Sequence, residues 1–201
     1  MRHLQAAGGT ALTSGTTGRG ILGTRAAWAL GLGIAAVGYG TDLLTKQLAL
    51  AHLDPSHPPV LLGGLLRLQL IRNPGAAFSM GEDFTIVLTL IAVAALVAVL
   101  AFMLPRARHR GWVVALGLLL AGILGNLTDR IFRPPAPLHG HVIDFLQLPN
   151  FAIFNVADMC ITFAAVLIVW LVVITQVDFA GVSTKESAKG PAKGTDTQGP
   201  A

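Results

Sequence analysis

Residues Phe84–Leu104 read FTIVLTLIAVAALVAVLAFML and contain no charged side chain. A helix needs about 20 apolar residues to cross the hydrocarbon core of a bilayer, so this stretch predicts a membrane-spanning helix. The composition agrees, because 53% of the 201 residues are hydrophobic, 12% are charged and the mean hydropathy is +0.67. Soluble domains carry about 25% charged residues. The composition therefore excludes a soluble enzyme and indicates an integral membrane protein.

Three further apolar segments are long enough to span a bilayer, over residues 26–50, 112–128 and 159–177. We therefore expect an all-α membrane protein with four transmembrane helices over residues 26–178. The tails at 1–25 and 179–201 are rich in small and polar residues, and we expect both to be disordered. The single cysteine, Cys160, lies in an apolar run and is expected to be a small packing residue without a disulfide partner.

The basic residues predict the orientation of the helices. The N-terminal tail, the connection between the second and third segments and the C-terminal tail hold nine of the 14 lysines and arginines. The positive-inside rule places these parts, and thus both termini, in the cytoplasm. The nine residues are Arg2, Arg19, Arg25, Arg106, Arg108, Arg110, Lys185, Lys189 and Lys193.

Three carboxylates are predicted to fall at one depth near the outer side. At about 1.5 Å per residue, Asp129 lies about 26 Å along a helix that begins at Trp112. By the same rise, Asp42 lies about 24 Å along the first helix, and Asp158 stands at the outer start of the last one. Ionisable residues within a membrane are costly, so these three are candidates for function.

The connection between the first two segments predicts a small extracytoplasmic β-element. Leu66–Leu70 alternates apolar and polar side chains, which is typical of a half-buried strand. Asn73-Pro74-Gly75 predicts a turn after it.

Two patterns within the helices have structural explanations as well as functional ones. Asp42 precedes Lys46 by four residues, the spacing of a helical ion pair that would let both charges enter the membrane together. Ala121 and Gly125 form a small-xxx-small pattern that favours close helix packing.

Two acidic residues 14 positions apart could form a catalytic pair. Asp144 lies in the extended apolar stretch HVIDF, and Asp158 opens a helix after FNVA. Two facing carboxylates share a proton, so one can deprotonate water while the other protonates a substrate carbonyl, which is the chemistry of a metal-free peptide hydrolase. From spacing alone, Asp129 could equally belong to the pair, and Asp158 could be only a helix cap.

Other chemistries have weaker support in the sequence. His139, His141 and Asp144 could bind zinc, but the close His-x-His spacing and the missing fourth ligand argue against it, and no metal or other cofactor is expected. The same carboxylates would suit a transporter or proton relay, and the polar residues could instead join helices in a membrane scaffold.

Five blocks together resemble lipoprotein signal peptidase, the type II signal peptidase of bacteria. They occur in that family's order, cover about residues 26–177 and are specific as a set. The blocks are Asp42…Lys46, Asn73–Phe78 (NPGAAF), Gly125-Asn126…Asp129-Arg130, Val142–Phe145 (VIDF) and Phe154–Asp158 (FNVAD).

The resemblance implies an aspartyl peptidase of the bacterial cytoplasmic membrane with its active site near the extracytoplasmic face. It would remove signal peptides from diacylglyceryl-modified prolipoproteins, cleaving on the N-terminal side of the lipidated cysteine. It would also be a target for a cyclic lipopeptide inhibitor. From the sequence itself we expect a monomer among membrane lipids, since nothing requires more than one copy. We expect no nucleic-acid binding, because most of the net charge of +4 sits in loops and tails.

The resemblance also assigns roles to residues. It gives the catalytic pair as Asp144 and Asp158. It implies that a further set lines or orders the site, namely Asp42, Lys46, Asn73, Gly75, Asn126, Asp129, Arg130, Asn155 and Ala157. The chain departs from the family in Phe132–His139 (FRPPAPLH), a longer connection whose prolines predict a stiff surface excursion that leaves the motifs intact.

Overall fold

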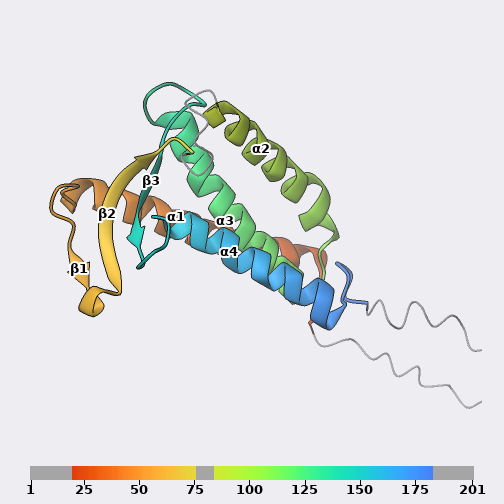
Figure 1. Ribbon diagram of the computed structural model, residues 1–201. Helices are drawn as coiled ribbons and strands as arrows, with labels where there is room; N and C mark the ends of the chain where they lie inside the picture. The colour runs from red at the N-terminus through yellow and green to blue at the C-terminus, as the bar shows by residue number, and fades with distance from the viewer. Residues whose placement is uncertain (1–19, 76–83, 183–201) are drawn as a thin grey trace, which may run out of the picture.

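The structure, a computed structural model, describes residues 20–75 and 84–182. The predictions for the outer parts of both tails and for Ala76–Phe78 lie outside the described residues. The four predicted spans are confirmed as helices long and apolar enough to cross a membrane (Figure 1). They are α1 (Thr24–His52), α2 (Phe84–Ala98), α3 (Arg110–Phe132) and α4 (Val156–Val169).

Two of the helices continue in a different helical form. A π-helical segment, η3 (Val99–Met103), extends α2 and leads into the short 3₁₀ turn η4 (Leu104–Arg106). The π-helical segment η5 (Trp170–Thr175) extends α4 in the same way. These extensions bring α2 and α4 to full membrane-spanning length.

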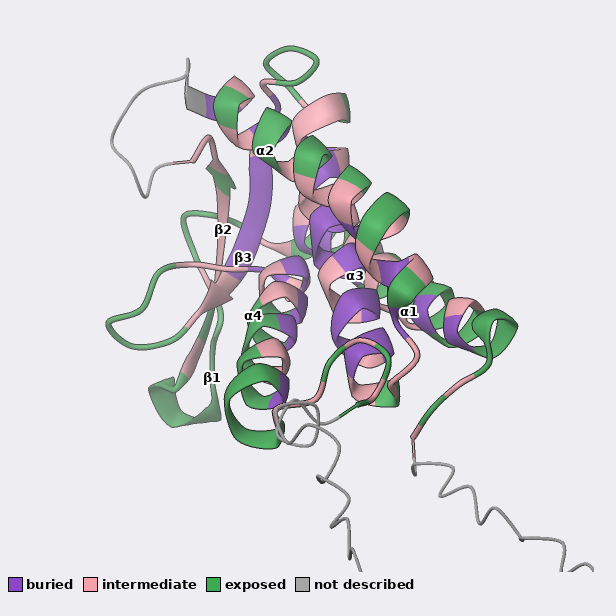
Figure 2. Ribbon diagram, turned by 90° about the vertical axis from the view of Figure 1, so that its right-hand side faces the viewer, coloured by how far each residue is buried: buried purple, intermediate pink, exposed green. Residues whose placement is uncertain are grey.

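The central helix is α3, which Figure 2 shows as the most continuously buried of the four. In the most apolar 18-residue stretch of α3, 61% of the residues are buried, whereas 11–22% are buried in the corresponding stretches of the other three spans. Small residues allow this close packing, since a Cβ added at Gly38 of α1 would lie 2.7 Å from the Ala121 Cβ. The predicted small-residue pattern therefore serves helix packing at Ala121.

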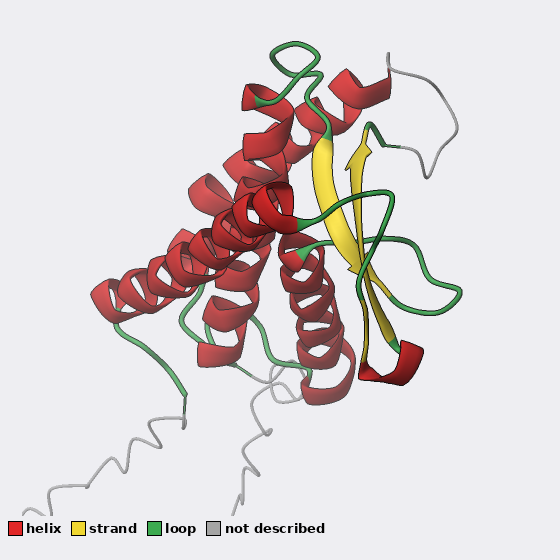
Figure 3. Cartoon of the chain, turned by 90° about the vertical axis from the view of Figure 1, so that its left-hand side faces the viewer, coloured by secondary structure: helices red, strands yellow, loops and turns green. Residues whose placement is uncertain are grey.

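Three antiparallel strands lie beside one end of the helices (Figure 3). They run in the order β1 (Val60–Leu61), β2 (Leu66–Asn73) and β3 (Val142–Gln147), with the 3₁₀ turn η1 (Leu62–Gly64) between the first two. The strand predicted at Leu66–Leu70 is confirmed and continues to Asn73. Because β3 pairs with β2, Ile71 lies opposite Asp144 and Asn73 lies opposite Val142. The sheet thus brings a residue of the fourth block next to the second block.

The other end of the helices is closed by three chain segments. Leu22 N donates to Arg108 O at 2.8 Å, and Arg108 N donates to Phe179 O at 2.7 Å. Trp112 Nε1 also donates to Val177 O at 2.9 Å. Both ends of the described chain therefore lie at the same end of the helices, as an even number of spans requires. The assignment of that end to the cytoplasm stays a prediction.

The proline-rich connection after α3 forms an exposed excursion without a helix or strand, as predicted. Thr89 Oγ1 of α2 donates to Leu138 O at 2.8 Å, and Gly140 N donates to Arg130 O at 2.9 Å. The excursion is therefore held against α2 and the end of α3, and it returns directly into β3.

Candidate active site

Four aspartates from four elements lie in one hydrogen-bonded network at the sheet end of the helices. Asp42 comes from α1, Asp129 from α3, Asp144 from β3 and Asp158 from the first turn of α4. The first three are at most 2% exposed, while Asp158 is half-buried. The structure thus places together the three helix carboxylates and the strand carboxylate that the sequence singled out.

Asn155 bonds to both members of the candidate pair. Its Nδ2 donates to Asp144 Oδ1 at 2.6 Å. Its Oδ1 accepts from Asp158 N at 3.0 Å, and its own N donates to Asp158 Oδ2 at 3.2 Å, which together make a capping box at the start of α4. Asp158 therefore takes part in capping α4. The same asparagine, Asn155, also connects Asp158 to Asp144 through hydrogen bonds.

Asn126 of α3 provides a second link. Its Nδ2 donates to Asp158 Oδ1 at 2.8 Å, and its Oδ1 accepts from Asn155 Nδ2 at 3.2 Å. Both asparagines have their side-chain donors and acceptors directed into the network, which fixes their orientation.

The turn after β2 supplies the other partner of Asp144. Asn73 Nδ2 donates to Asp144 Oδ2 at 2.8 Å, and Asn73 Oδ1 accepts from Gly75 N at 2.8 Å. Gly75 has a φ of +111°, which a residue with a Cβ rarely adopts, and a Cβ there would also meet Leu88. The predicted turn is thus present, and it orients the amide that contacts Asp144.

Burial raises the pKa of Asp144 from the usual value near 3.8 to about 6. The hydrogen bonds from Asn73 and Asn155 and the charge of Lys46 oppose this rise, whereas the nearby carboxylate of Asp158 adds to it. Asp144 therefore takes up a proton at a much higher pH than an exposed aspartate does.

Asp42, Lys46 and Asp129 form a buried ionic cluster behind the pair. Lys46 Nζ lies 2.8 Å from Asp42 Oδ2 and 2.8 Å from Asp129 Oδ2, so the predicted Asp42–Lys46 ion pair is confirmed. Asp42 Oδ1 accepts from Ala157 N at 2.8 Å. The fourth member is Arg133, whose Nε bonds to Asp129 Oδ1.

Arg133 was not among the site residues predicted from the sequence. The signal was available, because Arg133 follows Asp129 by four residues, as Lys46 follows Asp42. Arg130, which was among them, interacts electrostatically with Asp129, Asp144 and Asp158, and its buried Nη1 has no hydrogen-bond partner among the described residues.

A mostly apolar cavity of about 470 Å³ opens at Asp158. Phe151 and Phe154 precede α4 and meet edge to face at a centroid distance of 5.8 Å, while Met159, Thr162 and Phe163 come from α4 itself. Phe163 is 59% exposed on the outer surface of α4, so the cavity lies along a side of the helix that faces the membrane. Asp158 is the one ionisable residue of its lining.

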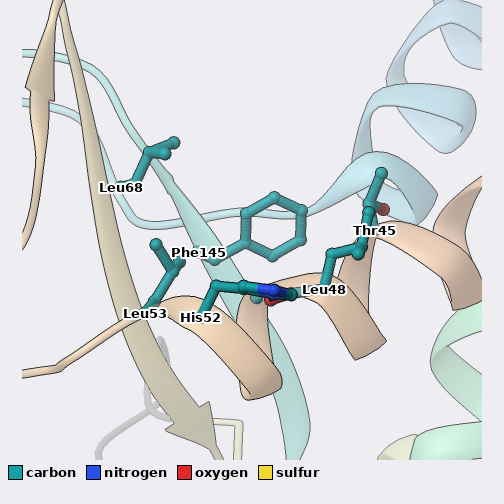
Figure 4. A pocket seen from close by; sticks show the side chains of 7 residues that line it. Thr45, Leu48, His52, Leu53, Leu68 and Phe145 are labelled. Carbon is teal, nitrogen blue, oxygen red and sulfur yellow. The ribbon is translucent and has the colours of Figure 1, made fainter.

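A second apolar cavity, of about 270 Å³, lies between α1 and the sheet. Figure 4 shows Phe145 of β3 and Leu68 of β2 facing Leu48 and His52 of α1 across it. Phe145 follows Asp144 on the strand, and successive side chains of a strand point to opposite faces. This cavity is therefore on the other face of β3 from Asp144.

The two histidines of the zinc interpretation lie at the end of the proline-rich connection, just before β3. His139 Nδ1 contacts Pro137 O at 3.2 Å in the exposed excursion, and His141 directly precedes β3. Within residues 20–75 and 84–182, no three His, Cys, Asp or Glu side chains are grouped closely enough to hold a metal ion.

A four-helix membrane fold with two carboxylates joined by hydrogen-bonding asparagines fits a membrane enzyme of the aspartic type. Comparison with known proteins identifies the family. The sequence model of the signal peptidase II family matches residues 34–174 of this chain. The chain therefore belongs to this family of aspartic-type peptidases. This membership favours an enzyme over the transporter and scaffold alternatives.

Individual relatives agree with this. The lipoprotein signal peptidase of Rhodococcus jostii is 47% identical over 141 residues, which are 70% of this chain and 71% of that protein. The lipoprotein signal peptidase of Streptomyces griseus is 46% identical over 141 residues, with the same coverage. A solved bacterial membrane enzyme superposes with a TM-score of 0.60 at 26% identity, covering 77% of this chain and 97% of that one.

Proposed function

We propose that this protein removes signal peptides from diacylglyceryl-modified prolipoproteins at the outer face of the bacterial cytoplasmic membrane. It cleaves the peptide bond on the N-terminal side of the lipidated cysteine and works as a monomer. Family membership supports the substrate class, and the basic residues of the chain support the orientation.

The observation that carries the catalytic assignment is the double bonding of Asn155. One amide contacts the Asp144 carboxylate and caps the helix turn that holds Asp158. Asp129 has no such link, because its two oxygens are taken by Lys46, Arg133 and a backbone N–H. The catalytic pair is therefore assigned to Asp144 and Asp158. Asp129 is assigned to the residues that order the site around them.

The two carboxyl groups have different environments, which suits different roles in one reaction. Asp144 is buried and its raised pKa makes it the member that holds the proton. Asp158 is half-buried at the cavity, where its carboxylate can accept a proton from a water molecule. In the first step the water oxygen bonds to the scissile carbonyl carbon while Asp158 takes the water proton and Asp144 protonates the carbonyl oxygen.

Collapse of the resulting tetrahedral intermediate completes hydrolysis. The C–N bond breaks, the proton on Asp158 passes to the leaving amine, and a hydroxyl proton of the intermediate returns to Asp144. The products are a signal peptide with a free carboxyl group and a lipoprotein with a free amino group on its cysteine. Both aspartates end in their starting protonation states.

The cavity at Asp158 is suited to bind an apolar part of the substrate next to the scissile bond. Its aromatic and aliphatic lining can bury a hydrocarbon chain or an apolar side chain with a gain of about 25 cal/mol per Å². A cyclic lipopeptide inhibitor would compete for the same region. We propose that the remaining residues of the five blocks line or order the site: Asp42, Lys46, Asn73, Gly75, Asn126, Asp129, Arg130, Asn155 and Ala157.

Cleavage of defined substrates tests this function. The purified protein in detergent is incubated with a diacylglyceryl-modified prolipoprotein and, separately, with the same chain lacking the lipid, and the products are identified by mass spectrometry. We expect cleavage directly before the lipidated cysteine and little cleavage of the unmodified chain. Equal cleavage of both substrates, or no cleavage by folded protein, would contradict the proposal.

A further inference from the structure

Lys46 is the largest fully buried side chain among the described residues. Its ammonium group bridges two carboxylates, at 2.8 Å from Asp42 and 2.8 Å from Asp129. It also donates to Asn126 Oδ1 at 3.2 Å and lies 3.4 Å from Gly125 O. These contacts bring α1 and α3 together at the depth of the candidate pair.

Each carboxylate bound by Lys46 also holds the backbone directly before a proposed catalytic residue. Asp42 Oδ1 accepts from Ala157 N at 2.8 Å, and Ala157 precedes Asp158. Asp129 Oδ2 accepts from Ile143 N at 3.2 Å, and Ile143 precedes Asp144. Two hydrogen-bonded paths therefore start at one ammonium group and end one residue before each member of the pair.

We infer that Lys46 is a positioning residue for the peptidase reaction, because through Asp42 and Asp129 it sets where α4 and β3 present Asp158 and Asp144. The inference rests on the function proposed above. Lys46 acts through other residues and has no contact with the two catalytic carboxylates among the hydrogen bonds and ion pairs of the described chain.

The charges of the cluster make this role testable. Asp42 and Asp129 carry two negative charges, and Lys46 and Arg133 carry two positive ones, so the cluster is formally neutral. Replacing Lys46 with methionine leaves one buried negative charge unpaired, which is strongly unfavourable. A second substitution, Asp42→Asn, restores neutrality and keeps an oxygen that can accept from Ala157 N.

The loss of Lys46 is also expected to change the titration of Asp144. The charged groups that face this carboxyl are Lys46 from α1, Arg130 from α3 and Asp158 from α4, with Asp129 behind them. The positive charge of Lys46 lowers the pKa of Asp144, so its removal raises that pKa. The decline in activity that follows deprotonation of Asp144 is therefore expected at a higher pH in Lys46→Met than in wild type.

The experiment measures kcat, KM and their pH dependence for wild type, Lys46→Met, Asp42→Asn and the double variant, with the diacylglyceryl prolipoprotein as substrate. We expect Lys46→Met to lose most of kcat with little change in KM. The kcat of the double variant should be about tenfold higher than that of Lys46→Met, which is the size of a strong coupling between neighbouring residues. Leu44→Met, on the exposed side of α1, should match wild type.

Two results would overturn the inference. One is wild-type kcat and pH dependence in folded Lys46→Met. The other is a folded double variant no more active than Lys46→Met. If Lys46→Met does not fold, the neutral double variant is compared with Asp42→Asn, and a folded double variant as active as Asp42→Asn is then the contradicting result. A wild-type protein that does not cleave would contradict the proposed function instead.

Discussion

Asn155 Nδ2 lies 2.6 Å from Asp144 Oδ1, while the same residue is the N-cap of the helix that carries Asp158. One side chain therefore links strand β3 to the start of helix α4, next to the backbone pairing of Leu146 with Phe154. This places the two proposed catalytic carboxyl groups on a common support, and it allows the roles of Asn155 in stability and catalysis to be separated.

Asn155→Ser is expected to keep the helix cap and lose the contact with Asp144. A serine hydroxyl caps a helix about as well as an asparagine amide, but it is too short to reach the Asp144 carboxylate. We expect a thermal midpoint close to wild type and a kcat lower by about 10-fold to 100-fold, which corresponds to about 1.4 to 2.7 kcal/mol of lost transition-state stabilisation. Wild-type kcat in this variant would show that the contact has no catalytic role, and Asn150→Ser in the preceding loop is the control.

The raised pKa of Asp144 predicts a decline of activity above about pH 6 in the free enzyme. The pair needs one proton, and that proton is lost as the pH rises through its apparent pKa. Asn73→Ser removes an amide that lowers the pKa of Asp144, so the decline should move to higher pH. The measurement is kcat/KM against pH, and an unchanged or downward-shifted profile in Asn73→Ser would contradict the assignment.

The same pKa predicts a change in stability with pH. Because the folded pKa is raised above its unfolded value near 3.8, the protonated Asp144 contributes stability that is full below about pH 4 and is lost as the pH rises through about 6. Asp144→Asn cannot ionise, so its thermal midpoint in detergent should fall less than that of wild type between pH 5 and pH 7.5. Parallel curves would show that Asp144 is not titrating in this range.

Filling the cavity beside Asp158 is expected to weaken substrate binding. Thr162→Trp places a large ring among Phe151, Phe154 and Phe163 without touching the hydrogen-bonded network. We expect KM for the lipidated substrate to rise about tenfold, which corresponds to about 1.4 kcal/mol of binding. Val166→Trp, one turn further along the exposed side of α4, is the matched control and should leave KM unchanged. Equal effects of the two variants would exclude a binding role for the cavity.

The orientation of the chain is tested by cysteine labelling in a Cys160→Ala background. Ser56 lies beyond α1 at the sheet end, and Ala180 lies after η5 at the opposite end, both exposed. An impermeant maleimide added to intact spheroplasts should label Ser56→Cys, and it should label Ala180→Cys only after lysis. The reverse pattern would place the site on the cytoplasmic side.

Much of the fold could be predicted because the membrane imposes strong rules on sequence. Apolar runs of spanning length marked the four helices, and the rise per residue placed Asp42 and Asp129 at one depth. The alternation at Leu66–Leu70 marked β2. The pairing of β2 with β3 was not predictable in this way, because it joins segments separated by two membrane spans.

The site was less accessible from the sequence for the same physical reason. Local spacing could show the Asp42–Lys46 pair, but it could not show that Lys46 also binds Asp129 from another helix. Spacing left Asp129 and Asp144 as equal candidates, and the family resemblance decided between them. In the structure they differ in their partners, since Asp129 binds two cations and Asp144 binds two amides.

The central claim is that Asp144 and Asp158 together activate water. Its most direct test is the cleavage rate of a diacylglyceryl prolipoprotein by Asp144→Asn and Asp158→Asn, each shown to be folded by its thermal midpoint. Asp54→Asn, an exposed aspartate on the same side of the fold, is the control. We expect each of the two variants to lose about 10³-fold or more in kcat and the control to lose nothing. Wild-type turnover in either folded variant would contradict the account.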